Sequence, residues 1–302
     1  MRLGFSNKTK REMPLHLLVL PSLILVVMFS YIPMMGIVIA FQKYSATKGF
    51  FGSNWIGFEN FIYVFQLPGT MQVIWNTVII ASMKIVAGLI VPITIALLLN
   101  EIRHSLVKRG IQTLIYLPHF LSWIILGGIL IDILSPSTGI INQLLQMVGI
   151  EPIFFLADNR WFRYVLVFSD VWKEFGFSTI VYLAALTNIN PMLYEASTID
   201  GAGRWKQTIH ITLPGIVPIV VLMTTLALGN VLNAGFEQVF TLYNSTVYET
   251  GDILDTLVYR IGVIDAQYSV ATAVGLFKSV VSLIFISVSY FLAYRFAGYR
   301  IF

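Results

Sequence analysis

The sequence predicts an all-α, polytopic membrane protein, and its charge content and its apolar stretches are the observations that predict it. Of its 302 residues, 57% are hydrophobic and only 11% are charged, whereas soluble domains carry about 25% charged residues. The apolar residues gather in six stretches of 21 or more residues, and a transmembrane helix needs about 20. Six transmembrane helices are therefore predicted, at about 15–41, 73–99, 111–134, 164–186, 214–236 and 274–294.

The distribution of Lys and Arg predicts that both termini are cytoplasmic. With a cytoplasmic N-terminus, eleven of these residues fall on the inner side and five on the outer side, which satisfies the positive-inside rule. Residues 1–14 are then a cytoplasmic N-terminus and 15–302 a single transmembrane domain. The inner set is Arg2, Lys8, Lys10, Arg11, Arg103, Lys108, Arg109, Arg204, Lys206, Arg295 and Arg300; the outer set is Lys43, Lys48, Arg160, Arg163 and Arg260.

Composition and motifs exclude several functional classes. The chain has no cysteine, so disulfides and thiolate sites are ruled out, and its four histidines lack metal-ligand spacing. The net charge of +4 is spread thinly over the loops, which argues against nucleic-acid binding. No phosphate-binding G-x-x-x-x-G-K-[ST] motif occurs, so the chain should not hydrolyse ATP. We therefore predict no catalytic residue, metal or cofactor.

The loop 187–213, on the predicted inner side, is the most informative segment. Asn190 followed by Pro191 is a helix start, because Asn caps and Pro tolerates the first helical position. The predicted helix runs from Pro191 to about Ile199, is interrupted by Gly201 and Gly203, and is followed by a second helical stretch over 204–210. Such a bent element can insert into a groove on another protein.

This loop resembles the EAA loop of bacterial ABC importer permeases, whose coupling helices dock on the cytoplasmic ATPase. The likeness rests on three runs, with Ser197 in place of the usual third alanine. The stretches 172–186 and 230–279 further resemble permeases that import complex oligosaccharides. The matching runs are Glu195-Ala196-Ser197, Asp200-Gly201-Ala202 and Ile211-Thr212-Leu213-Pro214, with Gly235-Phe236-Glu237-Gln238 and Thr250-Gly251-Asp252 further along the chain.

The resemblance implies the fold of an ABC type I importer permease in the bacterial plasma (inner) membrane, acting as a transport subunit rather than an enzyme. It implies an oligosaccharide substrate, two cytoplasmic ATPase subunits and an extracytoplasmic solute-binding protein. The second half of the pore is either another copy of this chain or, as the resemblance implies, a different permease chain. The residues expected to couple to the ATPase are Tyr194, Glu195, Ala196, Ser197, Asp200, Gly201, Ala202, Gly203, Leu213 and Pro214.

Polar residues in or beside the predicted spans are the candidates for a substrate path. An intramembrane charge costs about 2.5–3.5 kcal/mol and should face protein or water. Two readings stay open for these residues: they line a path for sugar, or they hold helices together. Lys84, in the second span, could either snorkel or pair across helices. The candidates are Asp170, Lys173 and Glu174 in the fourth span, Asn230 and Asn233 facing one side of the fifth, and Glu237 just outside it.

Two other functional classes compete with an ABC importer. An ion-gradient-driven secondary transporter would need carboxylates near the midplane of the membrane, where Lys84 is the main charged residue. A membrane-embedded enzyme would need a reactive cluster, and the sequence shows none.

The predicted orientation can be tested with reporter fusions. A reporter fused after Arg109 or after Arg204 should read cytoplasmic, and one near Asn54 or Thr250 should read external. A reversed result at two of these sites would contradict the orientation and the coupling role of 187–213 together.

Overall fold

The computed structural model describes residues 7–297, with side chains described for 12–291 and for Tyr294 and Arg295. Residues 1–6 of the predicted N-terminal segment, including Arg2, and Arg300 at the other end lie outside the described residues. The chain divides into two compact units: residues 1–67 with 258–276, and residues 68–257 with 277–302. We call them unit 1 and unit 2.

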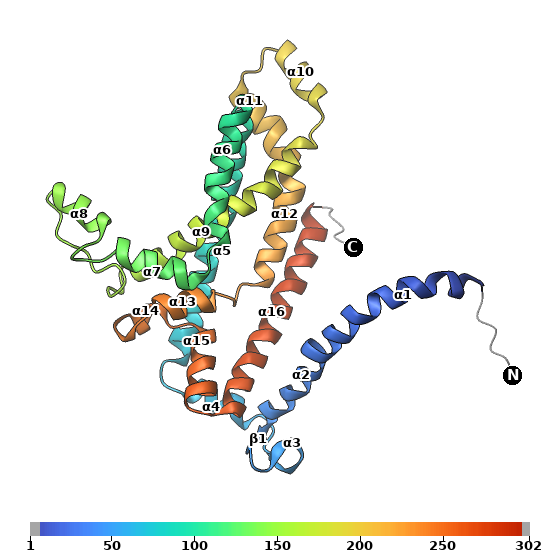
Figure 1. The fold of residues 1–302 in the computed structure, drawn as a ribbon, viewed down its shortest axis with the longest axis vertical. Coiled ribbons are helices and arrows are strands. Elements are labelled where there is room, and N and C mark those ends of the chain that lie inside the picture. Colours follow the sequence, from blue (N-terminus) through green and yellow to red (C-terminus); the bar gives the residue numbers. More distant parts are fainter. Residues whose placement is uncertain (1–6, 298–302) are drawn as a thin grey trace. The chain divides into compact units, whose positions relative to one another are not determined.

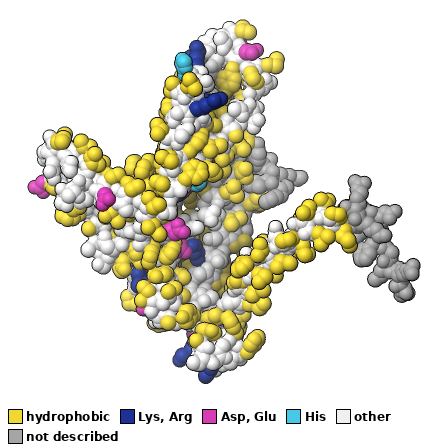
Figure 2. All heavy atoms as spheres, in the orientation of Figure 1, with side chains coloured by type: hydrophobic (Ala, Val, Ile, Leu, Met, Phe, Trp, Pro, Cys, Tyr) yellow, Lys and Arg dark blue, Asp and Glu magenta, His cyan; other side chains and the backbone are white. Residues whose placement is uncertain are grey.

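Unit 1 begins with a helical segment that continues without interruption to Phe41 (Figure 1). Large apolar side chains along it are exposed, among them Leu18 and Phe29, and hydrophobic atoms cover its visible face (Figure 2). An apolar surface of this kind suits lipid or another membrane helix. Its parts are α1 (Asn7–Val26), the π-helical turn η1 (Val27–Tyr31), α2 (Ile32–Met34) and the 3₁₀ segment η2 (Met35–Phe41).

The rest of unit 1 is a small folded loop region. The strands β1 and β2 pair antiparallel, with Gln42 opposite Trp55 and Lys43 opposite Asn54. The buried Asn60 side chain donates hydrogen bonds to the carbonyls of Ala40 (2.8 Å) and Gln42 (3.0 Å), which fixes the helix α4 against β1. The elements are β1 (Gln42–Lys43), α3 (Gly49–Gly52), β2 (Asn54–Trp55), α4 (Glu59–Gln66), η6 (Arg260–Ile264) and the start of α16 (Tyr268–Ala297).

Unit 2 is built on the helix pair α5 and α9, the most extensive helix contact in the chain. Ile80 of α5 and Leu166 of α9 are fully buried in its main core, together with Leu126, Val239 and Ile253 from other segments. The elements are α5 (Thr70–Glu101), α6 (Ser105–Tyr116), η3 (Leu117–Phe120), α7 (Trp123–Ile133), α8 (Ile140–Met147), α9 (Phe162–Thr187), α10 (Pro191–Ile199), α11 (Arg204–Gln207), η4 (Thr208–Thr212), α12 (Leu213–Gly229), α13 (Phe236–Leu242), η5 (Ser245–Val247), α14 (Tyr248–Gly251), α15 (Leu254–Tyr259, which runs on into unit 1) and the later part of α16.

The segment 111–134, expected as one helix, is two helices bent by 104°. Pro118 lacks the N–H that would continue a helix. The Ser122 hydroxyl accepts a hydrogen bond from the Ile125 amide (3.3 Å) and so begins α7 as a new helix. Pro118 and Ser122 both indicate this break in the sequence. The prediction of one continuous helix rested on the apolar composition of the stretch and did not use them.

The expected helix 214–236 ends at Gly229, so the prediction that Asn230 and Asn233 share one helix face is wrong. The two residues lie in a turn, where the Asn233 amide donates to the Asn230 carbonyl (2.8 Å). Gly235 then takes a left-handed conformation (φ +90°), which favours glycine over other residues. We call residues 230–235, between α12 and α13, the helix break.

Four helices among the described residues are long and apolar enough to cross a membrane, and the bent pair α6–α7 would make a fifth. They begin at Glu12, Thr70, Arg204 and Tyr268. The predicted fourth span is helical as α9, but it carries Asp170, Lys173 and Glu174 and is not among the four. The count of six spans and the cytoplasmic termini therefore remain predictions.

Candidate functional site

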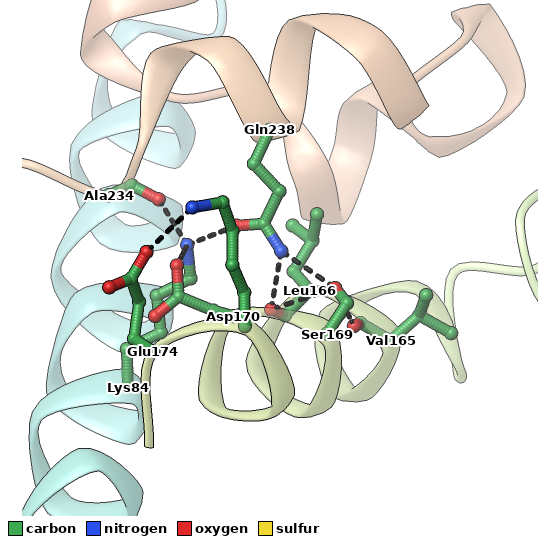
Figure 3. A network of polar contacts seen from close by, with 9 residues as sticks. Lys84, Val165, Leu166, Ser169, Asp170, Glu174, Ala234 and Gln238 are labelled. Atoms are coloured by element: carbon green, nitrogen blue, oxygen red, sulfur yellow. Dashed lines mark hydrogen bonds and ion pairs between the residues drawn. The ribbon is translucent and has the colours of Figure 1, made fainter. Parts of the chain in front are cut away.

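Lys84 stands at the centre of a buried polar network in unit 2 (Figure 3). Its side chain on α5 is 9% exposed, and its ammonium pairs with the Asp170 carboxylate of α9 at 3.1 Å. The ammonium also donates to the Ala234 carbonyl (2.7 Å) and contacts the Gln238 amide oxygen. A lysine has three N–H donors, so all three are used. Of the two alternatives predicted for Lys84, pairing across helices is the one observed.

Gln238 carries this network from α13 into α9. Its side chain is fully buried, and its amide nitrogen donates to the Leu166 carbonyl and to the Ser169 hydroxyl, both at 2.7 Å. The Ser169 hydroxyl donates in turn to the Val165 carbonyl at 2.6 Å. Gln238 was part of the sequence likeness, but no sequence pattern predicts its contact with α9.

The network supports the backbone of the helix break. Backbone that leaves a helix within a membrane must be buried in protein or line a cavity, because lipid supplies no hydrogen bonds. The carbonyl of Ala234, in the non-helical segment after α12, accepts a hydrogen bond from Lys84. A side chain added at Gly235 would place its Cβ 3.0 Å from the Lys84 nitrogen, so glycine also leaves the ammonium room.

A cavity of about 350 Å³ lies beside the network. Three of the residues predicted for a substrate path line it: Asp170, Asn230 and Asn233. Tyr182, which also lines the cavity, has a buried hydroxyl with no hydrogen-bond partner among the described residues. Buried polar atoms normally have a partner, so a water or a ligand group is expected beside this hydroxyl. The walls are completed by Ala81, Lys84, Ile85, Gly88, Leu89, Ser178, Met223, Ala227 and Gly235.

Lys173 and Glu174 belong to a second cluster, at the bend between η3 and α7. The Lys173 ammonium donates to the His119 carbonyl (2.9 Å) and to Glu174 (3.0 Å), while Glu174 meets the His119 ring nitrogen Nδ1 at 2.7 Å. The His119 ring stacks on Phe177, with 4.3 Å between centroids. The three charged residues of the fourth span therefore belong to two different clusters. Asp170 pairs with Lys84, whereas Lys173 and Glu174 contact His119 at the bend.

The sixth predicted path residue, Glu237, lies exposed in the first turn of α13. Sequence reasoning missed His119, the partner of Lys173 and Glu174, and the contact of Gln238 with Lys84. It also missed Tyr182, which lines the cavity. Among the described residues, no group of three His, Asp or Glu side chains is placed to hold a metal ion.

The loop 187–213 folds as the sequence predicts. The Asn190 side chain caps α10 by accepting from the Met192 amide (3.0 Å), and α10 runs from Pro191 to Ile199. Gly201 follows in the left-handed conformation (φ +77°), which lets the Ala202 amide bond back to the Ser197 carbonyl at 2.9 Å. The chain then enters α11 and continues through η4 into α12.

Internal hydrogen bonds make this loop a defined structure. The Gln207 amide nitrogen reaches the hydroxyls of Ser197 and Thr198, both at 3.0 Å. The Tyr194 hydroxyl lies 3.0 Å from that of Thr212. These contacts hold α10 against the segment that leads into α12, so the two halves of the loop should move together.

The solvent-exposed surface of the loop is apolar. Ile199 is 87% exposed and Trp205 is 76% exposed, and α10 and α11 stand at one end of unit 2 (Figure 1). Glu195 and Asp200 are exposed beside them. An exposed apolar patch with polar neighbours is typical of a protein-binding surface.

The comparisons with known proteins identify the family. The sequence model described as "Binding-protein-dependent transport system inner membrane component" matches residues 84–298, which is more than half of the chain. This protein belongs to that family. The match includes Lys84, the helix break and the whole loop 187–213.

Two proteins of Bacillus subtilis (strain 168) resemble the chain over nearly its full length. The polygalacturonan/rhamnogalacturonan transport system permease protein YteP is 44% identical over 93% of this chain and 88% of its own. Protein LplB is 43% identical over 95% of this chain and 90% of its own.

Two solved structures share the fold. A chain of a bacterial ABC transporter involved in the import of the acidic polysaccharide alginate has a TM-score of 0.89 and 39% identity, covering 96% of this chain and 98% of that one. The second is the bacterial alginate ABC transporter in complex with an alginate pentasaccharide-bound periplasmic protein, with a TM-score of 0.88 and 39% identity over 95% of this chain and 96% of that one.

Replacing Lys84 tests whether the helix break depends on this ammonium. Lys84→Leu should lower the stability of the purified protein by about 3–5 kcal/mol, because it leaves Asp170 without its partner and the Ala234 carbonyl without a donor. The double variant Lys84→Leu/Asp170→Leu should lose less, since the unpaired charge is gone.

Thermal unfolding of each variant in the same detergent measures these differences. Lys43→Leu is the control, because that side chain is exposed and has no ion-pair partner among the described residues. Wild-type stability in Lys84→Leu would contradict the role of the network.

Proposed function

We propose that this chain is the transmembrane permease subunit of an ABC importer that carries an oligosaccharide or a related carbohydrate across the bacterial plasma membrane. ATP hydrolysis in a partner subunit drives the transport, and the chain itself is not an enzyme. The observation that carries this conclusion is the structural likeness to the alginate importer, which extends over 96% of the chain. The carbohydrate named for YteP agrees with it.

The partners follow from the family and from the same relatives. A binding-protein-dependent system needs an extracytoplasmic solute-binding protein, and the alginate transporter has been solved with its periplasmic protein. One permease forms half of a pore. We propose that a second permease, of different sequence, forms the other half. Two cytoplasmic ATPase subunits complete the importer. We further propose six spans with both termini cytoplasmic.

We propose that the cavity beside Lys84 lies on the substrate path. Sugar hydroxyls need both donors and acceptors, and the cavity offers the amides of Asn230 and Asn233 and the carboxylate of Asp170. The unpartnered Tyr182 hydroxyl supplies a further donor or acceptor. Lys173, Glu174 and Glu237, expected on the path with them, are proposed to act at its edges, because none of them lines this cavity.

We propose that α10 and α11 are the coupling helices that dock on the ATPase, through the residues from Tyr194 to Pro214 predicted above. Support comes from the position of the loop between two cavity walls. It follows α9, which carries Ser178 and Tyr182, and it leads into α12, which carries Met223 and Ala227. A displacement of the loop by the closing ATPase would therefore act on both walls together.

An ion-gradient-driven transporter is the alternative that the sequence left open. The carboxylates of α9 both have cationic or imidazole partners, Asp170 with Lys84 and Glu174 with Lys173 and His119. The family membership favours the ATP-driven importer.

Variants in the coupling loop and in the cavity distinguish the roles of the two regions. Glu195→Lys reverses a charge on the docking surface, and Gly201→Pro cannot adopt the observed φ of +77°. Both should lower saccharide uptake about tenfold or more while the chain still reaches the membrane. Glu195→Lys would place a positive charge against the basic groups expected on the ATPase, and like charges at an interface are strongly unfavourable. Gly201→Pro would distort the turn between α10 and α11. Asn233→Leu should lower uptake about fivefold, equivalent to one hydrogen bond of about 1 kcal/mol, and should leave basal ATP hydrolysis intact.

Uptake and ATPase assays on the assembled importer measure both effects. Gly110→Ala is the matched control, because a Cβ there meets open space. Normal uptake in both loop variants would refute the docking assignment. Loss of assembly in Asn233→Leu would show that this residue holds helices together instead of lining a path.

A further inference from the structure

Unit 1 contains a second polar cavity, of about 490 Å³, which the transport path described above does not use. Three segments form its walls: the end of β1, the helix α4 and the turn between η6 and α16. Ligand pockets in proteins measure about 300–1,000 Å³, so the cavity is large enough for a sugar residue. The side chains that matter for its chemistry are Lys43, Tyr44, Glu59, Tyr63, Gln267 and Tyr268.

The walls of this cavity are fixed by hydrogen bonds between segments far apart in sequence. The Tyr44 amide donates to the Ser269 hydroxyl at 2.9 Å, and the rings of Tyr44 and Tyr268 meet edge to face with centroids 6.3 Å apart. The Asn60 side chain, bonded to two carbonyls, holds α4 in place. A ligand would therefore meet a surface that is already formed.

Backbone strain is located at the same cavity. Ala266, one of its lining residues, has φ +53°, the only positive φ outside glycine among the described residues. The left-handed conformation costs an alanine about 1–2 kcal/mol. Strain of this kind gathers at functional sites, where the surrounding structure enforces it. Here it turns the chain so that Gln267 and Tyr268 both border the cavity.

The free polar groups and rings of the cavity match the chemistry of a saccharide. The side chains of Lys43, Glu59 and Gln267 have no hydrogen-bond or ion-pair partner among the described residues, so their donors and acceptors are available. Tyr63 and Tyr268 are 44% and 48% exposed. A sugar ring presents C–H groups on its faces, which pack on aromatic rings, and hydroxyls around its edge, which need donors and acceptors.

The predicted orientation assigns this cavity to the outer side of the membrane, because Lys43 belongs to the outer set of basic residues. The end of unit 2 that carries the coupling loop is predicted to lie on the inner side. α4 ends just before α5 begins at Thr70, and α5 then rises about 1.5 Å for each of its residues until it ends at Glu101. Glu101 forms an ion pair with Arg204 of the coupling loop at 3.1 Å. The coupling loop and the entry to α5 are therefore at opposite ends of a helix long enough to cross the membrane.

We propose that this cavity is an outer saccharide subsite, which holds one sugar residue of the oligosaccharide as it leaves the binding protein. The proposal rests on the proposed function. The sugar stacks on Tyr63 and Tyr268 and bonds to Glu59 and Gln267 at its edge. Lys43 gives a uronate carboxylate a partner, so acidic saccharides are held more tightly than neutral ones.

The absence of cysteine from the chain allows a direct test. Gln267→Cys introduces a unique thiol at the cavity, and Thr47→Cys gives a matched, exposed control in the same unit that does not line it. A membrane-impermeant maleimide is applied to the assembled importer without binding protein, and labelling of this chain is read by mass spectrometry. The probes are alginate pentasaccharide and the neutral maltopentaose.

A saccharide at about three times its Kd should slow labelling of Gln267→Cys about fourfold, by simple occupancy, and should leave Thr47→Cys unchanged. Adding Tyr63→Ala should abolish the protection, and adding Lys43→Gln should remove the preference for the alginate probe.

Three results would overturn the proposal. If neither probe protects Gln267→Cys while uptake of a saccharide persists, the subsite is absent and the proposed function stands. If the unliganded binding protein alone protects the thiol and the saccharides do not, the cavity is a protein-docking surface. If the importer takes up no saccharide at all, the proposed function fails with the subsite.

Discussion

The contacts of the Lys84 ammonium are the interaction on which the polar cavity of unit 2 depends. A chain that leaves its helix inside a membrane exposes carbonyls and amides that lipid cannot satisfy. Here one buried lysine satisfies the Ala234 carbonyl of the helix break. The same nitrogen meets Asp170, so its charge is paired and its three donors are used. Three segments far apart in sequence are thereby joined at one atom, and the cavity forms beside it.

This arrangement gives the helix break two consequences at once. First, it brings polar side chains of an otherwise apolar segment to the cavity, because Asn230 and Asn233 lie in a turn that borders it. It also lies on the chain that comes from the loop 187–213 through α12. The loop is internally bonded, so a force on its exposed apolar face would reach the cavity through both α9 and α12. The structure thus joins the exposed apolar surface of the loop to a polar cavity through α9 and α12.

Much of this could be predicted from sequence, because the signals are local. Apolar length located the four helices that are long and apolar enough to cross a membrane. The Asn190–Pro191 cap and the glycine at 201 predicted the shape of the loop. The bend at Pro118 and the end of α12 at Gly229 were missed, since apolar composition alone does not distinguish a straight span from a broken one. The partners of Lys84 were beyond sequence reasoning, because Ala234 and Gln238 lie about 150 residues away along the chain.

The energy source is the central claim, and transport by the reconstituted importer measures it most directly. The chain would be purified with its second permease and ATPase subunits, placed in proteoliposomes, and given binding protein and labelled saccharide outside with ATP inside. The account predicts accumulation that requires ATP and the binding protein and that continues when ionophores collapse the proton and sodium gradients. Accumulation that stops with the ionophores and proceeds without ATP would contradict it.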